Sequence, residues 1–171
     1  MRIEVIWADI TSLEVDAIIS PASPSLVGNT GAEGAIHDAA GPEHLEMCQR
    51  MGGCQPGDAK LTPGFNLRAK YVIHAVGPRW MGGDANERQL LTSCVTRVME
   101  LARQYRMDMI AIPVLSADFG YPLREACQVM IATIAKNLTA GSIPRKVYMT
   151  AFNERQNREL AMAVAQTPQV H

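Results

Sequence analysis

The sequence lacks any excess of positive charge. Its 16 Lys and Arg residues are balanced by 17 Asp and Glu residues, and the formal net charge over 171 residues is −1. Domains that bind DNA or RNA broadly are usually strongly basic, so nucleic acid is not expected as a partner. No stretch approaches the roughly 18 uncharged apolar residues of a membrane span. The apolar run in "MRIEVIWADI" is also too short for a signal peptide, which predicts a cytoplasmic protein.

Metal-binding motifs are also missing. The four cysteines form no CxxC pair, and the four histidines form no HxxxH or HExxH pattern. Such spacings place two ligands on one side of a metal ion. We therefore predict no metal site and no cofactor, and we expect the cysteines to be reduced and partly buried as small apolar residues.

Apolar runs alternate with helical patterns along the whole chain. The predicted strands are residues 2–7, 16–20, 59–63, 71–76, 109–115 and 146–152. The predicted helices are residues 34–41, 42–51, 86–105, 123–138 and 154–166. The run 109–115 is apolar on both faces, which is typical of the centre of a mostly parallel sheet, whereas 2–7 alternates and suits an edge. The sequence predicts an α/β fold: one domain over residues 1–171, built as a three-layer α/β/α sandwich around a mixed, mostly parallel sheet.

Three loops follow strands of this predicted sheet, in the sequences "ADIT", "SPASPSLVGNTGAEG" and "LSADFGYP". Open α/β sheets bind ligands beyond the carboxyl ends of their strands. In the second loop, Gly28, Gly31 and Gly34 precede a helix, so backbone N–H groups and the helix dipole can converge on a phosphate. The spacing is neither a dinucleotide-binding fingerprint nor a P-loop. A flexible loop without a ligand therefore stays an open alternative.

The other two loops carry side chains suited to a nucleotide. The loop Ser116–Pro122 begins with small residues, so it would clamp a diphosphate against the glycine loop while Phe119 lies on a sugar. The Asp9 carboxylate would accept a hydrogen bond from an exocyclic amine such as adenine N6, and Phe152 would stack on a base. Taken singly, Asp9 also suits a turn, and Phe152 and Tyr121 suit a core.

Four segments together resemble one family. They are "ADITSLEVDAIISPASPSLVGNTGAEGAIHDAAGPE", "GDAKLTPGFNLRAKYVIHAVGPRW", "LLTSC" and "SADFGYP". In this order and spacing they resemble the macrodomain family of ADP-ribose-binding modules, closest to its bacterial and mitochondrial ADP-ribosyl hydrolases. The resemblance covers Ile3 to Phe152. It implies a three-layer sandwich that binds ADP-ribose or its relatives, including O-acetyl-ADP-ribose and ADP-ribosylated side chains of proteins.

The resemblance also implies roles for particular residues. Asp9 would receive the adenine amine, with the Ile10 backbone nearby, and Phe152 would flank the adenine. The residues beside the distal ribose and the diphosphate would be Gly31, Ala32 and Glu33, with Ser20 in the same ligand-binding set. The second phosphate loop would consist of Ser116, Ala117, Asp118, Phe119 and Gly120.

The hydrolase subgroup differs from this chain at functional positions. It typically reads N-A-A-N at residues 20–23 and G-G-G-G-V-D-G at residues 28–34. The resemblance therefore makes Ser23 and Glu33 the predicted catalytic residues, which would orient the distal ribose and activate the attacking water. Serine lacks the donor and acceptor of an amide, and glutamate moves the carboxylate by one methylene. Asp118, where a glycine is expected, would bring negative charge near the diphosphate.

We therefore predict a domain that binds ADP-ribose or a related adenine nucleotide, with weakened hydrolysis. One alternative is an active ADP-ribosyl or O-acetyl-ADP-ribose hydrolase that uses Glu33. The other alternative is a protein-interaction module that has lost its nucleotide. Retention of Asp9 and the loop glycines favours binding, whereas the substitutions at Ser23 and Glu33 argue against full activity.

Overall fold

A six-stranded sheet forms the centre of the protein. The computed structural model describes residues 2–139, 141 and 143–168. The strands are β1 (Ile3–Trp7), β2 (Ala17–Pro21), β3 (Ala59–Pro63), β4 (Tyr71–Ala75), β5 (Met109–Pro113) and β6 (Lys146–Ala151), in the order β1-β6-β5-β2-β4-β3. Only β3 pairs antiparallel with its neighbour among these strands. The predicted mixed, mostly parallel sheet is confirmed, and the alternating strand β1 lies at an edge.

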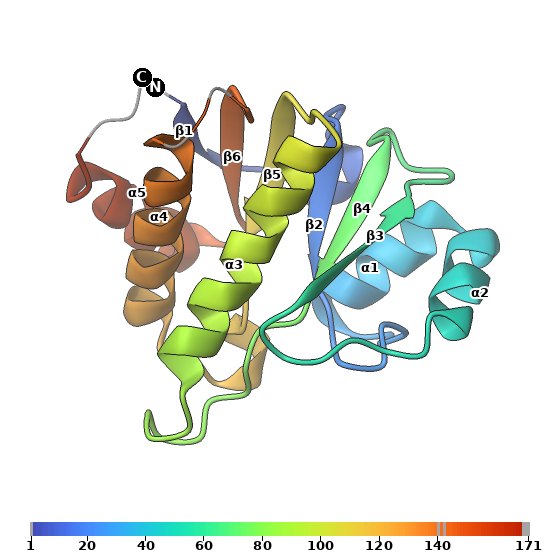
Figure 1. Ribbon diagram of the computed structural model, residues 1–171, viewed down its shortest axis with the longest axis horizontal. Coiled ribbons are helices and arrows are strands. Elements are labelled where there is room, and N and C mark those ends of the chain that lie inside the picture. The colour runs from blue at the N-terminus through green and yellow to red at the C-terminus, as the bar shows by residue number, and fades with distance from the viewer. Residues whose placement is uncertain (1, 140, 142, 169–171) are drawn as a thin grey trace.

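Helices cover both faces of this sheet (Figure 1). They are α1 (Gly31–Ala40), α2 (Pro42–Arg50), α3 (Glu87–Gln104), α4 (Leu123–Thr139) and α5 (Glu154–Ala165). Ile18 and Ile19 are adjacent in β2 and point to opposite faces, as the strand period of two requires. Ile19 belongs to the apolar cluster formed with α3, α4 and α5, whereas Ile18 packs with Ile36 of α1. The predicted three-layer sandwich is therefore confirmed.

The first helix begins earlier than predicted. We expected a start at residue 34, but α1 begins at Gly31, after Thr30 as its N-cap. Glycines carry no apolar periodicity, so the sequence pattern assigns this first turn to the loop. The remaining elements lie within about two residues of their predicted bounds. The earlier start brings the positive N-terminal end of α1 to the sheet edge where β2 ends.

Short polar contacts fix the loops at that edge. Asp9 is the N-cap of a 3₁₀ turn, η1 (Ile10–Ser12), and its carboxylate accepts a hydrogen bond from the Thr11 amide. Asn153 caps α5 in the same way, through the Gln156 amide. A second 3₁₀ turn, η2 (Ala117–Phe119), follows β5.

In the part of the chain that the structure describes, no helix is long and apolar enough to cross a membrane.

Candidate functional site

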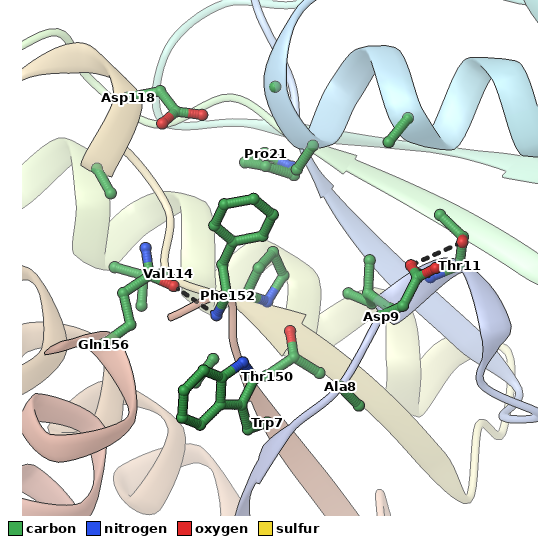
Figure 2. A pocket seen from close by; sticks show the side chains of 17 residues that line it. Trp7, Ala8, Asp9, Thr11, Pro21, Val114, Asp118, Thr150, Phe152 and Gln156 are labelled. Carbon is green, nitrogen blue, oxygen red and sulfur yellow. Dashed lines mark hydrogen bonds between the residues drawn. The ribbon is translucent and has the colours of Figure 1, made fainter. Parts of the chain in front are cut away.

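A cavity of about 670 Å³ opens where four parallel strands end. Pockets for small-molecule ligands and cofactors are commonly of this size. Its lining comes from the ends of β1, β2, β5 and β6, from η1 and η2, and from the first turns of α1 and α5 (Figure 2). The lining residues are Trp7, Ala8, Asp9, Ile10, Thr11, Pro21, Gly31, Ala32, Ala35, Pro113, Val114, Ala117, Asp118, Thr150, Ala151, Phe152 and Gln156. The cavity therefore lies at the edge where the sequence predicted a ligand.

One part of the lining combines a carboxylate with two aromatic rings. Asp9 Oδ1 accepts hydrogen bonds from the Thr11 amide at 3.0 Å and the Thr11 hydroxyl at 2.7 Å. Within the described residues Asp9 Oδ2 makes no hydrogen bond, so it can accept one from a ligand. Trp7 is 60% exposed and Phe152 is 83% exposed, which is unusual for large apolar side chains. A planar, partly apolar ligand with an amine on its rim would satisfy all three side chains.

Another part of the lining is the N-terminus of α1. Gly31 and Ala32 of its first turn line the cavity, and Thr30 makes no side-chain cap bond within the described residues. An uncapped helix N-terminus carries partial positive charge and favours a phosphate. The carboxylate of Asp118 already lies close to this helix N-terminus. A Cβ added to Gly31 would lie only 2.9 Å from Asp118 Oδ2, so the Asp118 side chain sits over the first turn of α1.

The two predicted catalytic residues contact each other beside the cavity. Glu33 is buried at 6% exposure, and its Oε2 accepts a hydrogen bond from the Ser23 amide at 3.1 Å. Its Oε1 occupies the place that a Cβ on residue 28 would need, so any larger residue than Gly28 would displace the Glu33 carboxylate. The Ser23 hydroxyl lies 3.1 Å from that of Ser25. The Glu33 carboxylate therefore holds loop 23–28, and neither Ser23 nor Glu33 is among the residues that line the cavity.

The remaining predicted residues divide between the lining and its surroundings. Ser20 and Ser116 are buried but do not line the cavity. Ser116 Oγ packs against Gly77 and has no hydrogen-bond partner in the described part of the chain. Phe119 faces the Arg79 guanidinium, whose carbon lies 5.3 Å from the ring centroid. The predicted residues that line the cavity are Asp9, Ile10, Gly31, Ala32, Ala117, Asp118 and Phe152. Those that do not are Ser20, Ser23, Glu33, Ser116, Phe119 and Gly120.

Sequence reasoning missed two features. Trp7 lines the cavity, although its place at the end of a strand beside Asp9 was a usable signal. The second feature is a buried cluster in which ligand atoms of His37, His44 and Cys48 lie within 4.8 Å of one another. His44 and Cys48 are four residues apart on α2, a spacing that places both on one helix face.

The sequence model of the Macro domain matches residues 19–130. The chain belongs to the macrodomain family. A macro domain-containing protein of Chlorobaculum tepidum is 45% identical to it over 90% of this chain and 90% of its own length. An O-acetyl-ADP-ribose deacetylase of Citrobacter rodentium is 43% identical over 92% of each chain. The solved structure of an Oceanobacillus iheyensis macrodomain variant with ADPR superposes on this macrodomain with a TM-score of 0.91, at 32% identity, covering 95% of this chain and 91% of that chain.

Proposed function

We propose that this macrodomain binds ADP-ribose or a related adenine nucleotide in the cavity at the carboxyl ends of its strands. Candidate ligands are free ADP-ribose, O-acetyl-ADP-ribose and ADP-ribosylated side chains of proteins. The observation that carries the proposal is the pairing of Asp9 and Phe152 with the α1 N-terminus in the lining of one cavity. The similar structure with ADPR supports it. The four free, buried cysteines fit a reducing, cytoplasmic location.

We infer from the lining residues which part of the cavity would hold each part of the ligand. Adenine would place its amine against Asp9 Oδ2 and its ring beside Phe152, with Trp7 as a second apolar surface. The diphosphate would lie at the first-turn amides of α1, and the distal ribose would approach loop 23–28. The oxygens of the ligand then meet backbone donors, and its flat base meets exposed aromatic rings.

We further propose that hydrolysis by this protein is slow. Glu33 accepts a hydrogen bond from the Ser23 amide and packs against Gly28, so its carboxylate supports the loop. A general base must reach its water at about 2.6–3.2 Å. Glu33 would have to leave its buried position to do so. The alternative, an active hydrolase that uses Glu33, is favoured by relatives named O-acetyl-ADP-ribose deacetylase.

Calorimetric titration tests the binding proposal. We expect ADP-ribose to bind at one site per chain, AMP to bind more weakly and ribose 5-phosphate to bind most weakly. The reason is that the adenine and the diphosphate would make most of the proposed contacts with the cavity lining. The purified protein would be titrated with each compound in the same buffer. No measurable heat with millimolar ADP-ribose would contradict the proposal and favour a protein-interaction module.

Replacing Asp118 by asparagine should tighten ADP-ribose binding about fivefold to tenfold at low salt. The carboxylate sits over Gly31, where the diphosphate would lie, and an exposed pair of like charges costs about 1 kcal/mol. The gain should shrink as salt screens the repulsion. Asp38→Asn is the matched control, since it removes one exposed carboxylate from α1 away from the cavity lining. Equal affinity of Asp118→Asn and the parent at low salt would show that Asp118 turns away when the nucleotide binds.

A further inference from the structure

A cluster of nitrogen and sulfur side chains is buried between α1, α2 and the sheet, apart from the nucleotide cavity. His37 comes from α1, His44 and Cys48 from α2, and His74 from β4. His44, Cys48 and His74 are fully buried, and His37 is 8% exposed. None of the four lines the cavity. Polar side chains at such depth need partners, so the contacts among them decide what the cluster can do.

The contacts within the cluster are close to those of a tetrahedral metal centre. His37 Nδ1 lies 3.1 Å from His44 Nδ1, and Cys48 Sγ lies 3.8 Å from both His44 Nε2 and His74 Nε2. Zinc bonds of about 2.0–2.1 Å to nitrogen and 2.3 Å to sulfur require ligand atoms roughly 3.3–3.6 Å apart. His44 presents Nδ1 to His37 and Nε2 to Cys48, and one imidazole binds an ion through one nitrogen. Ligation would therefore require the His44 ring to rotate until a single nitrogen faces both neighbours.

The surroundings of two histidines also suit a metal. His37 Nε2 donates a hydrogen bond to the Leu26 carbonyl at 2.8 Å, because a carbonyl can only accept. Nε2 therefore carries a proton, and Nδ1 faces His44. Metal-ligating histidines usually donate their other N–H to a carbonyl or carboxylate in this way. His44 is fully buried between His37 and Cys48, and burial favours the neutral imidazole that a metal ion requires.

We propose that His37, His44 and Cys48 form a closed binding site for a divalent transition-metal ion of the zinc type. His74 Nε2 lies 3.8 Å from Cys48 Sγ and 2.9 Å from the Thr62 hydroxyl oxygen, so it would have to leave Thr62 to act as a fourth ligand. The donor set of imidazole and thiolate is the one that zinc prefers, and the lack of exposure indicates a structural role. Metal entry would replace the His37–His44 hydrogen bond and release the Cys48 thiol proton to solvent. The dication, the Cys48 thiolate and the buried Glu33 carboxylate then sum to zero charge. Glu33 and His37 are four residues apart on α1, a spacing that places them on one helix face.

Titration with Co²⁺ tests this site directly. The protein would be stripped with chelator, titrated with Co²⁺ under anaerobic conditions, and followed by absorption. We expect visible d–d bands and a thiolate-to-metal charge-transfer band that saturate at one ion per chain. Zn²⁺ should displace Co²⁺ and raise the Tm by about 5 °C or more at saturating concentration. These readouts are independent of nucleotide binding, so their failure would leave the proposed function untouched.

Three variants locate the ion. Cys48→Ser should abolish the charge-transfer band, and His44→Gln should weaken Co²⁺ affinity at least tenfold. Cys54→Ser is the matched control, because this buried thiol lies outside the cluster and should leave the titration unchanged. If Cys48→Ser does not fold, His44→Gln decides. An unchanged titration in His44→Gln, or no thiolate band in the parent, would overturn the proposal and leave a neutral hydrogen-bonded core.

Discussion

Changing Ser23 to asparagine and Glu33 to aspartate in one chain should raise the hydrolysis rate about 100-fold. In the parent, the Glu33 carboxylate is engaged by the Ser23 amide and packed against Gly28. Aspartate at this position would be one methylene shorter, and asparagine at residue 23 would offer both an amide donor and an acceptor to the distal ribose. Displacement of a catalytic group by about 1 Å can cost roughly 100-fold, so restoring both side chains should recover a similar factor.

The assay would compare the parent, Glu33→Gln and the double variant on an ADP-ribosylated protein and on O-acetyl-ADP-ribose. We expect a low rate in the parent, a lower rate in Glu33→Gln and the highest rate in the double variant. The Tm of each variant should be measured as well, because Glu33 is buried and supports loop 23–28. High activity in the parent that Glu33→Gln does not lower would show that another group activates the water.

Replacing Asp9 by alanine should weaken ADP-ribose binding by about 1–3 kcal/mol, or roughly 5- to 150-fold in Kd. The free Oδ2 would lose its hydrogen bond to the adenine amine, and the Thr11 contacts that position the η1 turn would also be lost. Asp9→Asn separates these effects. Its side-chain oxygen can keep the Thr11 contacts, while its amide would present a donor to the adenine amine, which is itself a donor.

Both variants would be measured by calorimetry with ADP-ribose and with AMP. The loss should be similar for the two ligands, because both contain adenine. Ser12→Ala is a suitable control, since it removes another hydrogen bond of the η1 turn from a residue outside the cavity lining. An unchanged Kd in both Asp9 variants would show that the base lies elsewhere.

Much of the fold follows from local patterns in the sequence. The period of two in the strands, the helical period of the long amphipathic segments and the cap at Asn153 act over a few residues, so they predict the elements and their order. The parallel sheet places the ends of its strands at one edge, which is why Asp9, Gly31, Asp118 and Phe152 were predicted to meet and do line one cavity. The start of α1 was placed late because glycines carry no apolar periodicity.

Side-chain direction was decided only by the tertiary structure. The sequence alone determined the family resemblance, the three layers and the sheet edge at which the cavity lies. It did not determine that Glu33 turns into loop 23–28, that Asp118 sits over Gly31, or that His37, His44 and Cys48 meet in the core. These contacts join residues from different elements or loops, so they depend on packing through space and on the rotamers that packing allows. Local sequence patterns carry no information on such contacts until the layers are assembled.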